Sequence, residues 1–318
     1  GQCVKVAMVV LNWNKSDLTI SLAANVENIE KDLNPTIIIV DNGSIIEERQ
    51  KLVNFAISRS NWRVISEDNL DKYNNTTTSN VIILLNHNYG YAKGNNYGLK
   101  LAYRLGYRYA VISNNDVIME HPVIAQLIES MERLENVAVI GPKIVGPNND
   151  IQGPFDKPSL YDLFFYQIFY PVLWPIEKAR KRLLKRKRTT AVQFPYRLMG
   201  CFMVVNLEVM SKIDWLDENT FLYAEELILA EKLRRVSYKT AYVDSVHVKH
   251  LHGVSTIGMG KRNIIMRLIE SNLYYFKTYR GYNKIELALV KFGLLYNNFF
   301  LRPIVVTLKS GSKLLFER

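Results

Sequence analysis

Long apolar runs alternate with stretches of helical periodicity through the first half of this chain. Residues 4–11 and 36–40 are almost continuously apolar, which is typical of strands buried on both faces. Similar runs follow at 81–85, 109–112 and 137–140, while apolar residues recur with helical spacing at 17–31, 92–105 and 122–134. This alternation predicts an α/β fold with a mostly parallel sheet and helices on both faces.

Four of the predicted strands end in polar tips. These tips are Asn12-Trp13-Asn14, Asp41-Asn42-Gly43, residues 86–90 and residues 114–116. The carboxyl ends of parallel strands meet at one edge of a sheet, where open α/β folds hold their ligands. The tips therefore predict a nucleotide-binding cleft, although turn formation alone would account for some of them.

Asp116 is the side chain in these tips that most needs an explanation. Together with Asn114 and Asn115 it ends the apolar run 109–112. A carboxylate beside two amides can ligate a hard divalent cation that holds phosphates. Taken alone, the same residues fit a turn, because Asn and Asp cap turns through their own side chains.

A glycine-rich stretch at 88–98 leads into one of the predicted helices. It lacks the GK[ST] of a P-loop and the glycine spacing of a dinucleotide fingerprint. Gly90 and Gly94 would let the backbone approach a phosphate near a helix N-terminus, and Lys93 and Asn95 offer side-chain contacts. An ordinary glycine loop is the alternative.

The second half of the chain contributes acids and histidines. Glu225 and Glu226 stand at the start of a predicted helix that runs to about residue 236. They are candidates for a general base, or simply charges favoured by the helix dipole. His247, His250 and His252 are expected on one face of a strand. A single histidine that completes the Asp116 cation site is more economical than a separate zinc site.

Composition limits the class of protein. With 318 residues, 48% of them hydrophobic, the chain can bury a large core in one elaborated α/β domain or two domains. Cys3 and Cys201 are too far apart in sequence to suggest a disulfide framework or a structural zinc site, which favours a reducing cytosol. No secretory signal is visible.

The net charge of +11 is concentrated in two segments. Residues 178–188 and 261–318 carry +8 each, which leaves −5 on the rest of the chain. Each segment adjoins apolar sequence, at 163–176 and 285–308, that is too short or too interrupted to span a membrane. Two interpretations are open: interfacial membrane association, and ordinary core beside a solvated basic helix. RNA binding is a weaker third, and we expect no nucleic-acid partner.

These motifs, in this order, resemble the family 2 inverting glycosyltransferases of the GT-A fold. The resemblance rests on the strand tips, residues 88–96, 200–203 and 221–226, Asp217-Glu218 and His252-Gly253. It is nearest to bacterial rhamnosyltransferase-like and capsule or O-antigen enzymes. It covers roughly residues 4–255, without the basic insert at 155–192 or the last sixty residues.

The resemblance implies a role for individual side chains. It assigns a nucleotide base pocket to Asp41, Asn12 and Asn42, and a Mg²⁺ or Mn²⁺ site on the donor diphosphate to Asp116, with His252 completing it. Glu226 would be the base that deprotonates the acceptor. The other implied positions around the donor and the base are Asn14, Lys93, Asn95, Asn114, Asn115 and Glu225.

Two departures from the family pattern qualify these assignments. Asn114 replaces the first aspartate of the metal motif, so that a single carboxylate is left and metal affinity is expected to be modest. The Glu-Asp pair of the family is Glu225-Glu226 here, so the base assignment could shift by one residue.

The expected protein is a catalytic domain at 1–260, carrying the insert, followed by a helical segment at 261–318. It would transfer a sugar from a UDP- or dTDP-sugar to a hydroxyl of a lipid-linked oligosaccharide, as a peripheral protein on the inner face of the plasma membrane. A non-catalytic scaffold with the same fold is the alternative. The insert is expected to be a membrane anchor, an acceptor-side lid or a contact within a homo-oligomer.

Overall fold

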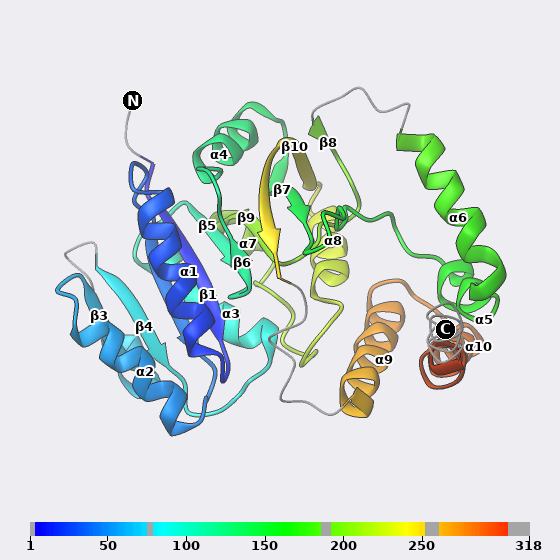
Figure 1. Ribbon diagram of the computed structural model, residues 1–318, viewed down its shortest axis with the longest axis horizontal. Helices are drawn as coiled ribbons and strands as arrows, with labels where there is room; N and C mark the ends of the chain where they lie inside the picture. The colour runs from blue at the N-terminus through cyan, green and yellow to red at the C-terminus, as the bar shows by residue number, and fades with distance from the viewer. Residues whose placement is uncertain (1–3, 75–78, 186–191, 252–260, 305–318) are drawn as a thin grey trace, which may run out of the picture. The chain divides into compact units, whose positions relative to one another are not determined.

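The computed structural model describes residues 4–74, 79–185, 192–251 and 261–304 (Figure 1). The chain divides into two compact units. The first contains Gly1–Asp156 and Ala191–Gly260, and the second contains Lys157–Thr190 and Lys261–Arg318. The insert and the C-terminal segment, which we described from the sequence as separate appendages, thus belong to one unit.

A single sheet organises the first unit. Its strands are β1 (Val6–Asn12), β2 (Thr36–Asp41), β3 (Trp62–Ser66), β4 (Asn80–Leu84), β5 (Tyr109–Ser113), β6 (Val117–Ile118), β7 (Val137–Val145), β8 (Val192–Gln193), β9 (Phe202–Asn206) and β10 (Lys239–His250). Their order is β3-β4-β2-β1-β5-β9-β7-β10-β6, with β8 paired to β10. β9 is antiparallel to both of its neighbours, whereas β1, β2, β3, β4 and β5 form a parallel block. The predicted mostly parallel sheet is confirmed.

Helices cover both faces of this sheet. Residues of α1 (Ser16–Ile29), α2 (Ile46–Ile57) and α4 (Ile124–Arg133) pack into one apolar core with Met8 of β1. Residues of α3 (Tyr91–Arg104), α7 (Leu207–Lys212) and α8 (Glu225–Arg235) pack into the other with Val9. Successive side chains of a strand point to opposite faces, so a continuous apolar run is what a doubly covered strand requires. A 3₁₀ turn, η1 (Glu67–Lys72), follows β3.

The chain topology determines which strand ends meet. β1 lies between β2, to which it connects through α1, and β5, which the chain reaches from β4 through α3. From β1 the chain runs to β2, and from β5 it runs to β6 and β7, so the connections leave these two neighbouring strands in opposite directions along the strand order. Ligand crevices form outside the carboxyl ends of strands at such a switch point. Asn12 ends β1 and Ser113 ends β5 at this position.

The second unit is helical in the residues that the structure describes. It contains the π-helical turn η2 (Tyr161–Phe165), α5 (Tyr166–Ile168), α6 (Tyr170–Lys185), α9 (Lys261–Thr278), α10 (Lys284–Tyr296) and a second π-helical turn, η4 (Asn297–Leu301). Its buried apolar residues include Ile269, Tyr275, Phe276, Val290 and Leu294.

One close helix crossing joins the two sequence segments of this unit. Gly293 of α10 has no side chain where the backbone carbonyl of Leu163 lies, and a Cβ there would overlap that oxygen. Across the described ranges, no helix combines the length and the apolar character needed to cross a membrane.

Gly90 precedes α3 in a left-handed conformation and offers a test of this fold. Its φ is +88°, and a Cβ would lie 2.6 Å from the backbone oxygen of Phe221. Gly106 after the same helix has a φ of +89° but nothing within 4 Å of a Cβ. We expect Gly106→Ala to cost about 1 kcal/mol of unfolding free energy for its backbone conformation, and Gly90→Ala to cost about 1–3 kcal/mol more for the overlap.

Urea denaturation of the two variants measures this difference. Equal destabilisation would mean that the α3 start does not depend on its contact with the Phe221 backbone.

Candidate active site

A buried hydrogen-bond network connects the tips of β1, β2 and β5. Asn12 donates from Nδ2 to Asp41 Oδ1 at 3.0 Å and accepts at Oδ1 from Thr19 Oγ1 at 2.6 Å. Asn115 donates from Nδ2 to the same Thr19 hydroxyl at 3.2 Å. Asn12, Asp41, Thr19 and Asn115 are all buried. Three strand ends that the sequence predicted to be neighbours are thus linked side chain to side chain.

Asp41 is fully buried and held by donors from its own chain. Its Oδ1 accepts from Ser44 Oγ at 2.6 Å, and its Oδ2 accepts from Arg49 Nε at 3.2 Å. Arg49 on α2 also donates from Nη2 to the carbonyl of Leu85. A buried carboxylate requires such a partner, because an unpaired charge in the interior is expensive. The assignment of Asp41 to a nucleotide base stays a prediction.

Asn42 and Asn14 hold loops around this network. Asn42 Nδ2 donates to Asn88 Oδ1 at 2.9 Å and to the Gly90 carbonyl at 3.1 Å, while its Oδ1 accepts from the Tyr89 amide at 3.0 Å. Asn42 therefore fixes the glycine-rich loop in front of α3. Asn14 has a φ of +54°, and its Oδ1 accepts from the Ile45 amide at 2.8 Å.

The first turns of α3 bring two further predicted residues near this loop. Lys93 is half-buried, with its Nζ 4.6 Å from the centre of the Tyr89 ring. Asn95 is buried and donates from Nδ2 to the Tyr91 carbonyl at 3.0 Å. Within the described residues its Oδ1 accepts no hydrogen bond. An unpaired buried acceptor is rare in folded proteins and marks a position where a ligand donor would fit.

Asp116 lies beside His250, at ion-pair distance. β6 follows Asp116 directly and pairs with the end of β10 through Val117 and His250. This pairing brings His250 Nε2 to 3.2 Å from Asp116 Oδ1, and both side chains are buried. His250 Nδ1 lies 2.7 Å from Gln152 Oε1, a contact that orients the ring.

The oxygens of Asp116 are suited to a cation. Across the residues that the structure covers, neither carboxylate oxygen accepts a hydrogen bond, although the side chain is only 1% exposed. Such a carboxylate is costly unless a proton, a cation or a ligand compensates it. No cluster of three or more His, Cys, Asp or Glu that could hold a metal occurs in the described ranges. A divalent cation here would therefore depend on Asp116, its histidine neighbour and oxygens from a ligand.

The expectation that three histidines share one strand face is wrong. His247 Nε2 contacts Glu120 Oε1 at 3.0 Å and its Nδ1 lies 3.2 Å from His121 Nε2, whereas His250 contacts Asp116. Residues three apart on a strand point to opposite faces, so only one of the two can face the site. His252 lies outside the described residues.

Glu225 and Glu226 begin α8 after two residues in the left-handed region, Tyr223 with φ +74° and Ala224 with φ +64°. Glu225 is buried, whereas Glu226 is half-buried. The Glu226 carboxylate occupies the space beside Gly200, where any Cβ would overlap its Oε1. Tyr91 donates from its hydroxyl to the Gly200 carbonyl at 3.2 Å.

Electrostatic effects indicate that these acids are near one another. Burial raises the pKa of the Tyr91 hydroxyl well above its usual range, and the charges of Glu226, Glu225 and Asp116 raise it further. Burial, followed by Asp116 and Glu226, raises the pKa of the Cys201 thiol. Asn114, half-buried, connects to the same segment, because its amide donates to the Cys201 carbonyl at 2.9 Å. The strand tips and the start of α8 thus enclose one acidic site.

Burial makes Glu225 the less suitable of the two glutamates for a base. Burial raises the pKa of Glu225 well above the ordinary 4.5, and the neighbouring charge of Glu226 raises it further. A general base has to be ionised at the working pH. Glu226, more exposed than its neighbour, is therefore the better candidate for a base.

Solved structures of other proteins share this architecture, although no sequence comparison finds a relative. No protein-family model matches the sequence, and no curated protein matches it. Among solved structures, GalNAc-T7 with UDP, GalNAc and Mn²⁺ matches with a TM-score of 0.58 at 11% identity, over 87% of this chain and 49% of the other. A mannosyltransferase from Pyrobaculum calidifontis in complex with GDP-Man and Mn²⁺ matches with a TM-score of 0.53 at 13% identity, over 92% and 69%.

The chain has the GT-A fold. It spans about half the length of the GalNAc-T7 chain. The neighbours that share this fold are glycosyltransferases whose structures hold nucleotide or nucleotide-sugar with Mn²⁺. In the GT-A chain described here, the acidic site lies at the carboxyl ends of the central parallel strands.

Sequence reasoning missed several residues of this site. Arg49, Tyr91 and His250 contact the predicted residues Asp41, Asn95 and Asp116, and Gln152 contacts His250. Tyr91 and His250 were within motifs that we singled out, so the local pattern could have included them. Arg49 lies on the helix after the predicted tip and carried no motif, and the partner of Gln152 is 98 residues away in sequence.

The raised pKa of Glu225 predicts a pH-dependent stability. The unfolded chain loses this proton near pH 4.5 whereas the folded chain retains it, so wild-type stability falls as pH rises from that value through the folded pKa. Glu225→Gln removes this loss of stability, because the amide does not titrate. We expect its Tm to decline less than that of wild type as the pH rises above about 4.5, with a difference of about 2–4 °C for each kcal/mol of stability that wild type loses through this group.

Thermal unfolding at a series of pH values tests this, with the exposed Glu129→Gln as the matched control. Parallel Tm curves for wild type and Glu225→Gln would contradict the protonated buried state.

Proposed function

We propose that this chain is a nucleotide-sugar-dependent glycosyltransferase. The observation that carries the proposal is the buried Asp116, whose oxygens accept no hydrogen bond from the described residues, in a site that also contains Glu226. A buried carboxylate that accepts no hydrogen bond and lies 3.2 Å from an imidazole suits a cation or ligand rather than structure. The GT-A fold and the nucleotide-bound neighbours support the same reaction class.

The donor in this proposal is a UDP- or dTDP-sugar. Asn12, Asn14, Asp41 and Asn42 surround the loops where the base would bind. Lys93 and Asn95, on the first turns of α3, lie where a helix N-terminus favours phosphate. The fold neighbours hold UDP in one structure and GDP-Man in the other, so the fold accommodates more than one nucleotide.

Asp116 and His250 fit a bound Mg²⁺ or Mn²⁺, because the aspartate oxygens need a positive partner and the imidazole is already oriented. Asn114 and Asn115 supply amide oxygens nearby. When bound, the cation would neutralise charge on the donor diphosphate. With one carboxylate in the motif, we expect modest metal affinity in the absence of nucleotide.

Glu226 is the proposed base of an inverting transfer. It accepts the proton of the acceptor hydroxyl while that oxygen forms a bond to the anomeric carbon of the donor. The bond from this carbon to the diphosphate oxygen breaks, and its electron pair leaves with the nucleotide. Attack comes from the face opposite the leaving group, so the configuration inverts. Burial, followed by the charge of Glu226, raises the pKa of Glu225, which disfavours a second negative charge beside the base.

The acceptor in this proposal is a hydroxyl of a lipid-linked saccharide in bacterial cell-surface polysaccharide synthesis, presented at the inner face of the plasma membrane. This part rests on the sequence resemblance.

A non-catalytic nucleotide-sugar-binding scaffold is the second candidate. It is favoured by Asn114, which leaves the metal motif with one carboxylate. The two candidates differ in turnover: only the enzyme hydrolyses or transfers the donor sugar.

Asp116→Asn tests the metal and donor site. We expect Mn²⁺-dependent stabilisation by the donor to weaken by more than about tenfold, because the variant removes the carboxylate charge. Thermal shift with UDP-, dTDP- and GDP-sugars, in Mn²⁺ or chelator, measures it. The exposed Asp17→Asn is the control, and unchanged donor affinity in Asp116→Asn would remove Asp116 from the site.

Glu226→Gln tests the base. We expect donor affinity to persist and donor turnover to fall by about 10²–10⁴, because the amide cannot accept the proton. Calorimetry and release of nucleoside diphosphate measure the two quantities separately. Transfer or hydrolysis at near wild-type rate would refute the assignment, and no turnover in the wild type with any donor would favour the scaffold.

A further inference from the structure

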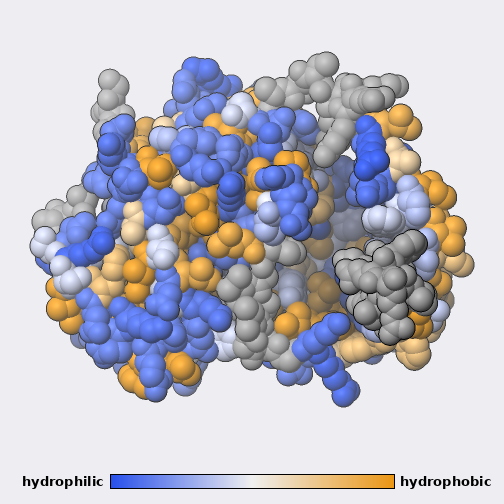
Figure 2. Space-filling view, viewed as in Figure 1, coloured by the Kyte–Doolittle hydropathy of each residue, from blue (hydrophilic) through white to orange (hydrophobic). Residues whose placement is uncertain are grey.

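The second unit exposes two rows of large apolar side chains. One follows η2, α5 and α6 through Tyr161, Phe165, Phe169, Val172 and Ile176, all exposed. The other follows α10 and η4 through Ile285, Phe292, Phe299 and Phe300. Figure 2 shows hydrophobic residues along the edge that α5 and α6 occupy in Figure 1. Contiguous apolar surface of this kind marks an interaction site.

Aromatic contacts join the two rows into one surface. The ring of Phe164 in η2 lies 5.0 Å from that of Phe165 and 6.4 Å from that of Phe292 in α10. Phe292, Tyr296 and Phe300 stack in sequence at 5.9 Å and 6.0 Å, with interplanar angles of 18° and 13°. Two segments about 120 residues apart in sequence therefore build one surface. We call this surface the aromatic face.

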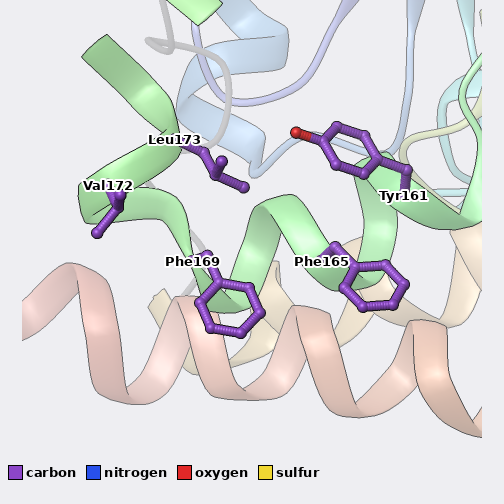
Figure 3. Close-up of a pocket in the computed structure, with 5 residues that line it drawn as sticks. All are labelled: Tyr161, Phe165, Phe169, Val172 and Leu173. Carbon is purple, nitrogen blue, oxygen red and sulfur yellow. The ribbon is translucent and has the colours of Figure 1, made fainter. Parts of the chain in front are cut away.

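The first row also lines an open pocket of about 560 Å³. Its lining residues are Tyr161, Phe165, Phe169, Val172 and Leu173 (Figure 3). The rings of Phe165 and Phe169 point in the same direction from successive turns. Only the hydroxyl of Tyr161 offers a side-chain polar atom, so the pocket suits a hydrocarbon rather than a polar ligand.

Basic side chains continue from this face along α6. Lys178, Arg180, Lys181 and Arg182 are exposed, and Lys178 Nζ lies 4.7 Å from the centre of the Trp174 ring. Glu177 is the only acid of α6. An apolar face followed by a basic helix matches the two layers of a lipid surface, in which acyl chains lie beneath anionic head groups.

We propose that the aromatic face docks on an anionic phospholipid bilayer, with an acyl chain in the Phe165–Phe169 pocket and the α6 cations on the head groups. A second copy of the chain fits less well, because mutual docking would bring two basic α6 helices together. The inference rests on the proposed function only in that it brings the enzyme to its lipid-linked acceptor. Vesicle binding requires no turnover, so Glu226→Gln should bind vesicles like wild type even if the activity proposal fails.

Vesicle sedimentation tests the aromatic face. The probe is vesicles of three parts phosphatidylcholine to one part phosphatidylglycerol, with Phe165→Ser and Phe169→Ser as variants. The matched control is Phe194→Ser in the first unit, because Phe194 is 49% exposed and Phe165 is 47% exposed. We expect each test variant to weaken partitioning by roughly tenfold and the control to leave it unchanged. Equal effects of test and control variants would overturn the proposal.

The contribution of the α6 cations to vesicle binding is tested against a charge-matched control. Arg180→Gln, Lys181→Gln and Arg182→Gln combined should weaken binding by roughly fivefold per lost charge at low salt. Combining Arg108→Gln, Arg133→Gln and Lys212→Gln in the first unit gives the same net charge, and this variant should bind like wild type. Equal binding to phosphatidylcholine alone and to the anionic vesicles would overturn the role of α6.

The depth to which the aromatic face enters the bilayer is measured by tryptophan fluorescence of the wild-type protein. Brominated acyl chains quench a tryptophan that reaches the interface. Trp174 on α6 is exposed, whereas Trp62 and Trp215 are buried and Trp13 in the first unit is half-buried. We expect quenching in wild type and its loss in Trp174→Phe. The proposal is overturned if the protein does not bind vesicles and its mass doubles with protein concentration but stays that of a monomer in Phe165→Ser. The aromatic face would then bind a second copy of the chain rather than a bilayer.

Discussion

The candidate site depends on one constraint: polar strand ends buried at the edge of a sheet must find partners within the protein. Asn12, Asp41 and Asn115 satisfy it through one network, to which Thr19 and Arg49 contribute from α1 and α2. The arginine offsets the charge of Asp41, which would otherwise be prohibitive in the interior. This network fixes the mutual positions of three strand ends, and every other side chain of the site is placed relative to it.

Asp116 departs from that constraint at the same edge. Asn12 and Asp41 are hydrogen-bonded within the network, whereas the oxygens of Asp116 accept no hydrogen bond from any described residue and have His250 Nε2 at 3.2 Å. Proteins retain an unsatisfied buried charge where function compensates its cost. Glu225 has the same surroundings but a different outcome, since burial and its neighbour raise its pKa and favour the neutral form. The site thus contains one carboxyl group that accepts no hydrogen bond and a second one whose charge is disfavoured by burial.

The parallel half of the sheet was predictable, whereas its antiparallel insertion was not. The runs at 36–40 and 109–112 are apolar except for Thr36, a pattern that doubly covered strands require, and both are strands within one residue of the predicted ends. β9 is also apolar over most of its length, but its place between β5 and β7 depends on pairings across about 65 to 97 residues. The site followed the same rule: strand tips were predicted from local sequence, whereas Gln152 was not, because its partner is 98 residues away. His250 faces Asp116 through the register of β10, which no local pattern specifies.

The start of α8 explains why the second glutamate, rather than the first, suits a base. Tyr223 and Ala224 both adopt positive φ, which costs about 1–3 kcal/mol for each residue without glycine's freedom. Strain of this kind persists only where surrounding contacts enforce it, and here the neighbouring loop holds Gly90 and Tyr91 through the Phe221 backbone. The turn directs Glu225 into the interior and leaves Glu226 against Gly200, where only a residue without a side chain leaves room. The backbone conformation before the helix, more than the chemistry of either carboxyl group, therefore separates the buried acid from the proposed base.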